Sequence, residues 1–218
     1  MEKYLLKNTN NWPKSGEVTW QSPSNIALVK YWGKYGEQLP KNTSISFTLN
    51  NCHTTTKLVY EQKEGNALSF GVFLDGKEKL DFKPKIQTFF ERVEKYFPFL
   101  RNYHFNIHTS NSFPHSSGIA SSASGMSALA LCLMDIESQI HEISKDYFNE
   151  KASFISRLGS GSASRSIEGP LIVWGEHEEV ENSSNLYGVV YKEEVNPVFL
   201  NYQDTVLLVD VGQKKVSS

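Results

Sequence analysis

Residues 113–140 read FPHSSGIASSASGMSALALCLMDIESQI and contain the longest helix that the sequence predicts. Helix propensity is high from Ser121 to Ile140, and small residues are concentrated at the N-terminal end of this stretch. Larger apolar residues recur at helical spacing, at Met126, Leu129, Leu133 and Ile136. The pattern predicts a helix with a buried face and a first turn whose backbone a ligand can approach closely.

The first turn of this helix is a candidate anion-binding site. Its N–H groups have no partner within the helix and lie at the positive end of the macrodipole, so a bound phosphate gains several charge-assisted hydrogen bonds. No lysine is needed, and no GxxxxGK[ST] phosphate loop occurs in the chain. The plainer interpretation, a serine-capped helix with a flexible entry segment, stays open from these residues alone.

Short β-rich segments precede and follow the helix. Strands are predicted at residues 18–32, 45–49, 54–60, 68–74, 103–108, 171–174 and 205–211. A second helix is predicted from Pro84 to just before Pro98, and a third from a cap at Ser144 to Leu158. The order is too irregular for a regular βαβ alternation, so the sequence predicts an α+β fold.

Composition and charge narrow the classes of function. The 218 residues suffice for one domain, or one domain plus a fragment, and the net charge of −2 provides no field for nucleic acid or an anionic membrane. Cys52 and Cys132 lack a CxxC or His/Cys cluster, so we expect buried, reduced thiols and no metal site. Since no signal-like leader and no run of ~20 apolar residues occurs, a soluble cytoplasmic protein is expected.

A second candidate site is the end of the first predicted strand, within NIALVKYWGK (residues 25–34). Lys30 and Lys34 supply ammonium groups suited to an anionic ligand. Tyr31 and Trp32 add apolar walls with a hydroxyl and an indole donor, and Gly33 permits close approach of the backbone. The alternative is a solvated strand end with an aromatic side chain in the core.

A third candidate site is GSGSASRS (residues 159–166). The segment combines backbone N–H groups, hydroxyls and the planar guanidinium of Arg165, which together suit a phosphate or a carboxylate. The alternative is a flexible Gly/Ser linker. Apolar residues on both sides favour a segment that is anchored at both ends.

These three segments, in this order, resemble the motifs NIAxxKYWGK, FPxxxGLASSA and GSGSAxRS of the diphosphomevalonate decarboxylases, within the GHMP kinase superfamily. The middle motif is shared across the superfamily, whereas the other two are specific to the decarboxylases. The resemblance implies a GHMP-type N-terminal domain of the ribosomal protein S5 domain 2-like fold. It also implies a leader at 1–17, the ATP- and substrate-binding domain at 18–200, and the start of a largely absent C-terminal GHMP domain at 201–218.

The activity that the resemblance implies is ATP-dependent decarboxylation of mevalonate 5-diphosphate to isopentenyl diphosphate, with ATP and Mg²⁺ as cofactors. The expected partner is a small-molecule substrate, with no nucleic acid and no membrane, and a homodimer stays open. Two alternatives remain: a related kinase of mevalonate or phosphomevalonate, and a catalytically dead fragment that binds ATP and a small molecule.

Residue roles carry over only onto matching positions. Lys30 and Arg165 are the implied catalytic residues: Lys30 orients the transferring groups, and Arg165 holds a carboxylate with two parallel contacts. The implied substrate-binding residues are Tyr31, Trp32, Gly33, Lys34, Ser160, Gly161, Ser162, Ala163, Ser164 and Arg165. The implied ATP-binding residues are Gly118, Ala120, Ser121 and Ser122. Lys85 aligns with a position at which many members carry an arginine directed at the substrate.

The family's catalytic aspartate is the one element without a counterpart. The resemblance places it in a DAGPN-like motif of a C-terminal domain, and no such motif occurs in the 218 residues. We therefore expect binding groups to be present and the chain alone to be inactive.

Overall fold

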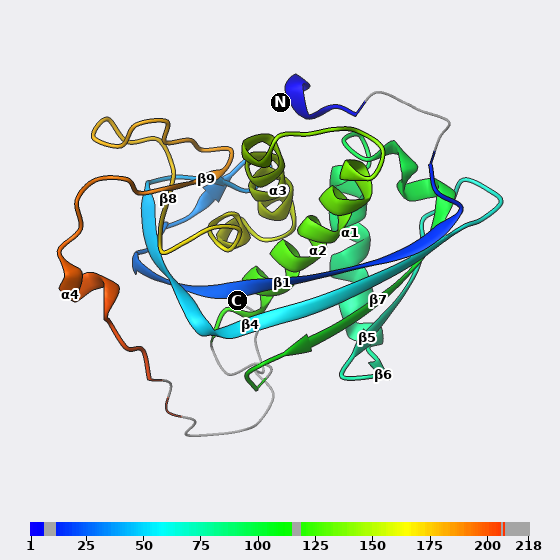
Figure 1. Ribbon diagram of the computed structural model, residues 1–218, viewed down its shortest axis with the longest axis horizontal. Helices are drawn as coiled ribbons and strands as arrows, with labels where there is room; N and C mark the ends of the chain where they lie inside the picture. The colour runs from blue at the N-terminus through cyan, green and yellow to red at the C-terminus, as the bar shows by residue number, and fades with distance from the viewer. Residues whose placement is uncertain (7–11, 115–118, 206, 208–218) are drawn as a thin grey trace.

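The longest strand, β4 (Ser44–Gln62), organises the sheet of the computed structural model, which describes residues 1–6, 12–114, 119–205 and 207. β1 (Ser15–Val29) pairs antiparallel with one edge of β4 along nearly its whole length. The other edge is shared, because β7 (Tyr103–Asn111) pairs with residues 54–62 and β8 (Leu171–Trp174) with residues 44–47. β4 therefore connects two regions of the sheet that otherwise have different partners (Figure 1).

The remaining strands extend the sheet at both ends. β5 (Ser69–Leu74) runs parallel to β7, and β6 (Lys77–Glu78) pairs with β5. At the opposite end, β9 (Gly188–Val190) pairs with β8. A separate two-stranded hairpin consists of β2 (Lys34–Tyr35) and β3 (Leu39–Pro40). The mixed sheet with its helices confirms the predicted α+β class.

Helices cover one face of the sheet (Figure 1). They are α1 (Lys83–Val93), α2 (Ser121–Ser138) and α3 (Lys145–Gly159), with a short α4 (Pro197–Leu200) apart from them. The shorter 3₁₀ turns are η1 (Glu2–Tyr4), η2 (Leu80–Phe82), η3 (Pro98–Asn102) and η4 (Gly161–Arg165). The four apolar positions predicted for α2 are all buried, which confirms its packing face. None of the described helices is both long and apolar enough to cross a membrane.

The boundaries predicted for the strands of β4 and for α1 were wrong. The strands predicted at 45–49 and 54–60 are one strand, β4, whose polar middle lies opposite a register shift of β1 between Pro23 and Asn25. The helix predicted from Pro84 ends at Val93 and is followed by a turn and η3. The strand predicted at 205–211 lies mostly outside the described residues; Thr205 and Leu207, which are described, are not in a strand.

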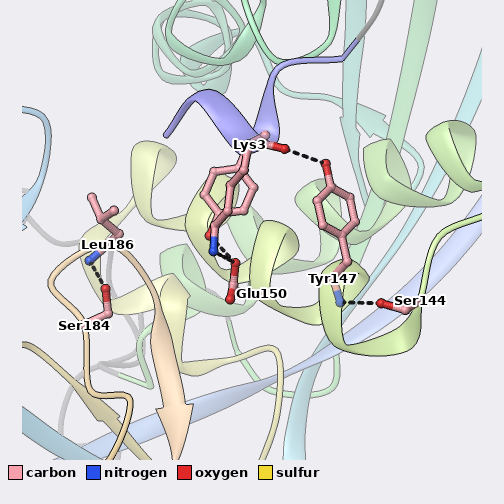
Figure 2. Close-up of polar contacts among 7 residues, drawn as sticks. Lys3, Ser144, Tyr147, Glu150, Ser184 and Leu186 are labelled. Carbon is pink, nitrogen blue, oxygen red and sulfur yellow. Dashed lines mark hydrogen bonds and ion pairs between the residues drawn. The ribbon is translucent and has the colours of Figure 1, made fainter.

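The N-terminal turn is part of the folded core. The Tyr4 side chain is fully buried, and its hydroxyl donates to Glu150 Oε1 of α3 at 2.5 Å. Figure 2 shows that Lys3 pairs with the same carboxylate and that its carbonyl oxygen accepts from the Tyr147 hydroxyl. The predicted cap of α3 is confirmed, since Ser144 Oγ accepts from Tyr147 N at 3.2 Å. These contacts fix the start of the chain against α3.

Candidate functional site

The KYWGK segment leaves the sheet earlier than predicted. β1 ends at Val29, and the next residues form a loop whose backbone is held by Asn42. The Asn42 side chain accepts from Trp32 N at 2.7 Å and donates to the Lys30 carbonyl oxygen at 3.0 Å. Gly33 has φ 142°, a conformation that side-chain-bearing residues rarely adopt. The prediction that the strand continues to Trp32 was therefore wrong. After Val29 the backbone bonds to the Asn42 side chain and not to a neighbouring strand.

The aromatic residues of this loop point in different directions. The Tyr31 ring packs edge-on against Trp174, with ring centroids 4.9 Å apart. Trp32 is 81% exposed, and Lys30 is also exposed. The alternative of an aromatic side chain packed into the fold thus fits Tyr31 and not Trp32.

The glycine- and serine-rich segment is a structured turn, and the linker alternative was wrong. Gly161 to Arg165 form the 3₁₀ turn η4, in which Ser164 Oγ donates to the Gly161 carbonyl oxygen at 2.9 Å. A Cβ atom at Gly161 would lie 2.7 Å from the Trp174 ring, so a larger residue requires that ring to move. Ser160 and Ser162 place their hydroxyls 3.5 Å apart, and Ala163 is buried.

Arg165 is the central charged group of the site and is only 2% exposed. Its guanidinium donates to Ser44 Oγ at 2.5 Å and, from two nitrogens, to Asn25 Oδ1. Burial lowers its pKa to about 10. Within residues 1–6, 12–114, 119–205 and 207, no carboxylate lies within ion-pairing distance of Arg165. The cation is oriented by neutral groups and left without a balancing charge.

The second and third candidate segments meet at this guanidinium. The Arg165 guanidinium carbon lies 5.6 Å from the Tyr31 ring and 5.8 Å from the Trp174 ring. A Cβ at Gly161 would lie 3.4 Å from Lys34 Cδ, so Lys34 borders the same turn. Partial desolvation, and then the charge of Arg92, lowers the Lys34 pKa. The two motifs therefore form one cationic site with aromatic walls.

Lys85 extends the positive potential from α1. Partial desolvation lowers its pKa, and the nearby charge of Lys34 lowers it further. Lys85 also lines a cavity of about 160 Å³ beside the start of α2. The structure thus places Lys85 at this cavity and within electrostatic reach of Lys34, whereas its predicted contact with a substrate stays a prediction.

The N-terminus of α2 opens onto the cavity. Ser121 and Ser122 line it together with Thr54, Asp81 and Asn111, and apolar side chains such as Met126 and Leu129 line much of the rest. Ala120, with φ 48°, is the N-cap residue, and its side chain makes no capping hydrogen bond. The serine-capped alternative was therefore wrong. Gly118, predicted to contact the same ligand, lies outside the described residues.

Three site residues were missed by sequence reasoning. Asn25 and Ser44 orient Arg165, and Asn42 shapes the KYWGK loop. Asn25 also donates to Ser166 Oγ at 2.7 Å. Asn25 lies within the quoted motif, but its contacts join residues more than 100 positions apart, and no local pattern predicts such pairs.

The comparison with known families decides the membership of the chain. The model of the diphosphomevalonate decarboxylase-like N-terminal domain matches residues 22–185, which include all three candidate segments. The chain belongs to the diphosphomevalonate decarboxylase family. A diphosphomevalonate decarboxylase from Danio rerio is 30% identical over 214 residues, which cover 92% of this chain and 50% of the relative. The chain spans about half the length of the curated relatives it matches.

Solved structures of diphosphomevalonate decarboxylases share the fold. One, on the mevalonate diphosphate mediated ATP binding mechanism of the enzyme from Enterococcus faecalis, has a TM-score of 0.63 and 29% identity, covering 81% of this chain and 51% of that chain. Another, described as MDDEF in complex with MVAPP, AMPPCP and magnesium, has a TM-score of 0.62 and 29% identity, with coverages of 80% and 49%. The likeness again extends over about half of each relative.

Proposed function

We propose that this chain provides the substrate- and nucleotide-binding part of an ATP-dependent mevalonate 5-diphosphate decarboxylase. The observation that carries the proposal is Arg165, a buried guanidinium without a carboxylate partner among the described residues, placed where two decarboxylase-specific motifs meet. A buried cation of this kind is stabilised by an anionic ligand, and a guanidinium matches a carboxylate with two parallel hydrogen bonds.

The reaction requires anions to be held in a fixed arrangement. Transfer of the ATP γ-phosphoryl group to the tertiary 3-hydroxyl releases ADP and creates a phosphate leaving group, and the hydroxyl proton would pass to the aspartate that the family carries in its C-terminal domain. The C3–O bond then breaks, and the electron pair of the C1–C2 bond forms the C2–C3 double bond as phosphate and carbon dioxide depart. Arg165 would orient the C1 carboxylate, while Lys30 and Lys34 would attract the phosphate groups. Catalysis of this type rests on positioning and charge stabilisation.

The nucleotide is assigned to the N-terminus of α2. Ser121 and Ser122 supply hydroxyls and the N–H groups of the first helical turn beside a cavity of about 160 Å³. No group of three His, Cys, Asp or Glu that could hold a metal occurs in the part of the chain that the structure describes. The hydroxyls of Ser121 and Ser122 suit Mg²⁺ bound mainly through nucleotide phosphates and water, and the ion would neutralise phosphate charge.

The test separates binding from turnover. Calorimetry with mevalonate 5-diphosphate, mevalonate 5-phosphate and ATP should give preferential binding of the diphosphate, whereas preference for the monophosphate would favour the related kinase. Assays for released phosphate and isopentenyl diphosphate should show no turnover by the 218 residues alone. Fusion to the C-terminal half of a family member, which carries the aspartate motif, should restore it. Turnover by the 218 residues alone would mean that the catalytic acid lies within them and not in the C-terminal domain. The absence of turnover in a folded fusion would support the alternative of a catalytically dead binding fragment.

A further inference from the structure

The hairpin that carries Lys34 is too small to hold itself in place. β2 and β3 contain two residues each, and the connecting residues Gly36 and Gln38 both have positive φ, at 49° and 62°. An isolated two-stranded hairpin is marginally stable in water even when it is longer. Within the hairpin, Lys34 Nζ donates to Gln38 Oε1 at 2.6 Å, so the ammonium moves with the hairpin, and contacts from elsewhere must keep the hairpin beside the turn η4.

Contacts at the base of the hairpin fix only one end. Lys41 N donates to the Gly33 carbonyl oxygen at 3.0 Å. The Asn42 side chain accepts from Trp32 N, which directly precedes the hairpin loop. The tip, Glu37, is exposed and lies within 4.0 Å of the exposed Lys95 ammonium. An exposed ion pair of this kind contributes little to stability.

The tip is anchored instead by Arg157, in the last turn of α3. Its side chain is buried; Nη1 donates to the Glu37 carbonyl oxygen, and Nε donates to the Leu186 carbonyl oxygen at 2.7 Å. Burial lowers the Arg157 pKa to about 10, and the Glu37 carboxylate partly opposes that shift. The planar guanidinium joins two backbone segments that a lysine ammonium cannot reach with the same geometry.

The second anchored segment is itself tied to the cationic site. Ser184 Oγ accepts from Leu186 N at 3.1 Å, as Figure 2 shows. The neighbouring Asn185 carbonyl oxygen accepts from Trp174 Nε1 at 3.0 Å, and Trp174 is the ring against which Tyr31 packs. Arg157 thus connects the hairpin tip to residues 185–186, which hold the Trp174 ring beside the cationic site.

We infer that Arg157 is a positioning residue: it holds the hairpin at residues 34–40 so that the Lys34 ammonium stays beside η4, and it acts on the substrate only through Lys34. The identity of the ligand in this inference rests on the proposed function. The anchoring of the hairpin does not, so the two can be tested separately.

Amide hydrogen exchange of the unliganded chain tests the anchoring. Gln38 N donates to the Gly36 carbonyl oxygen at the tip of the hairpin, so its exchange should accelerate at least several-fold in Arg157→Gln, while Lys41 N at the base and amides in the middle of α2 keep their rates. Lys95→Gln, which removes the other contact to Glu37, is the matched control and should leave the hairpin unchanged. If Arg157→Gln does not fold, the milder Arg157→Lys provides the comparison. Unchanged hairpin exchange in a folded variant overturns the inference.

A double-mutant cycle tests the route through Lys34. Calorimetry with mevalonate 5-diphosphate should show about tenfold weaker binding for Arg157→Gln or Arg157→Lys, which corresponds to about 1.4 kcal/mol. Combined with Lys34→Gln, the Arg157 substitution should cost almost nothing further, because its effect passes through the missing ammonium. Fully additive losses would overturn the inference and assign Arg157 a general structural role.

The outcomes distinguish the inference from the proposed function. If the folded wild-type chain does not bind mevalonate 5-diphosphate, or if Lys34→Gln binds normally, the proposed substrate role of Lys34 fails. Hydrogen exchange then still decides whether Arg157 anchors the hairpin.

Discussion

Asn25 Oδ1 accepts hydrogen bonds from both Nε and Nη2 of Arg165, at 3.4 and 3.3 Å. The amide oxygen fixes the plane of the guanidinium without neutralising it, so the charge remains for a ligand. Arg165→Lys keeps the charge and loses the planar two-point contact. We expect substrate binding to weaken by ~1.5–3 kcal/mol, the range for charge-assisted hydrogen bonds. Calorimetry with mevalonate 5-diphosphate measures this loss directly.

Arg101→Lys is the control for that substitution, because Arg101 pairs with Glu94 at the surface, far from the motif segments in sequence. It should leave affinity unchanged. If Arg165→Lys also binds normally, Arg165 serves the fold and not the substrate.

Ser122→Ala tests the nucleotide assignment. Loss of one hydroxyl hydrogen bond should weaken ATP binding by about 0.5–1.5 kcal/mol, or roughly two- to tenfold, and leave mevalonate 5-diphosphate affinity almost unchanged. Ser138→Ala removes a hydroxyl at the other end of α2 and should affect neither ligand. Equal losses for both ligands in Ser122→Ala would show that this helix terminus is not a dedicated nucleotide site.

The buried ion pair between Lys151 and Glu137, at 2.6 Å, joins α3 to α2. Burial raises the Glu137 pKa and lowers the Lys151 pKa, so each charge depends on the other. Lys151→Met leaves an uncompensated buried carboxylate and should cost ~3–5 kcal/mol of the free energy of unfolding. Urea denaturation measures the loss.

The double variant of Lys151→Met and Glu137→Leu should recover most of that stability, because well-packed apolar groups can replace a buried pair. Lys57→Met, at the exposed pair with Glu17, should cost about 1 kcal/mol or less. A similar loss at both pairs would contradict the role of burial.

Cys132 should be unreactive in the folded chain. Burial raises its pKa to about 12, so raising the pH from 7 to 9 leaves the thiol protonated as well as inaccessible. In a Cys52→Ser background, labelling by a thiol reagent should stay slow across this range and become fast in urea. Fast labelling that rises with pH under native conditions would show that the Cys132 thiol is accessible and ionises.

The expectation that both cysteines are buried was wrong for Cys52, which is partly exposed.

Local periodicity was enough to predict the helical core and the α+β class. Phe89 and Phe90 in α1, and Leu129 and Leu133 in α2, are buried as their spacing indicated. Irregular backbone was harder, because its hydrogen bonds come from distant residues. The loop after Val29 depends on the side chain of Asn42, for which strand propensity provides no signal.

The candidate site was predicted as three separate segments. Their residue types predicted cationic, phosphate-binding chemistry, which stays a prediction, and the convergence of Tyr31, Lys34 and Arg165 could be seen only in the tertiary fold. Arg157 was not singled out, since a buried arginine cannot be distinguished from an exposed one by its position in a helix. The hydrogen bonds of Arg157 to distant backbone carbonyl oxygens result from tertiary packing, and no local sequence pattern predicts them.

The shared edge of β4 has a consequence for how the chain folds during synthesis. Residues 54–62 of the strand find their β7 partner once residue 111 has been made, whereas residues 44–47 wait for β8, more than 120 positions downstream. Contacts of such high sequence separation close slowly, because the intervening loop loses entropy before the pairing is gained. The part of the sheet formed by residues 54–62 and β7 can therefore form while the chain is still growing. The edge around Ser44, which orients Arg165, stays open until late, so its backbone groups can pair with another chain during that interval.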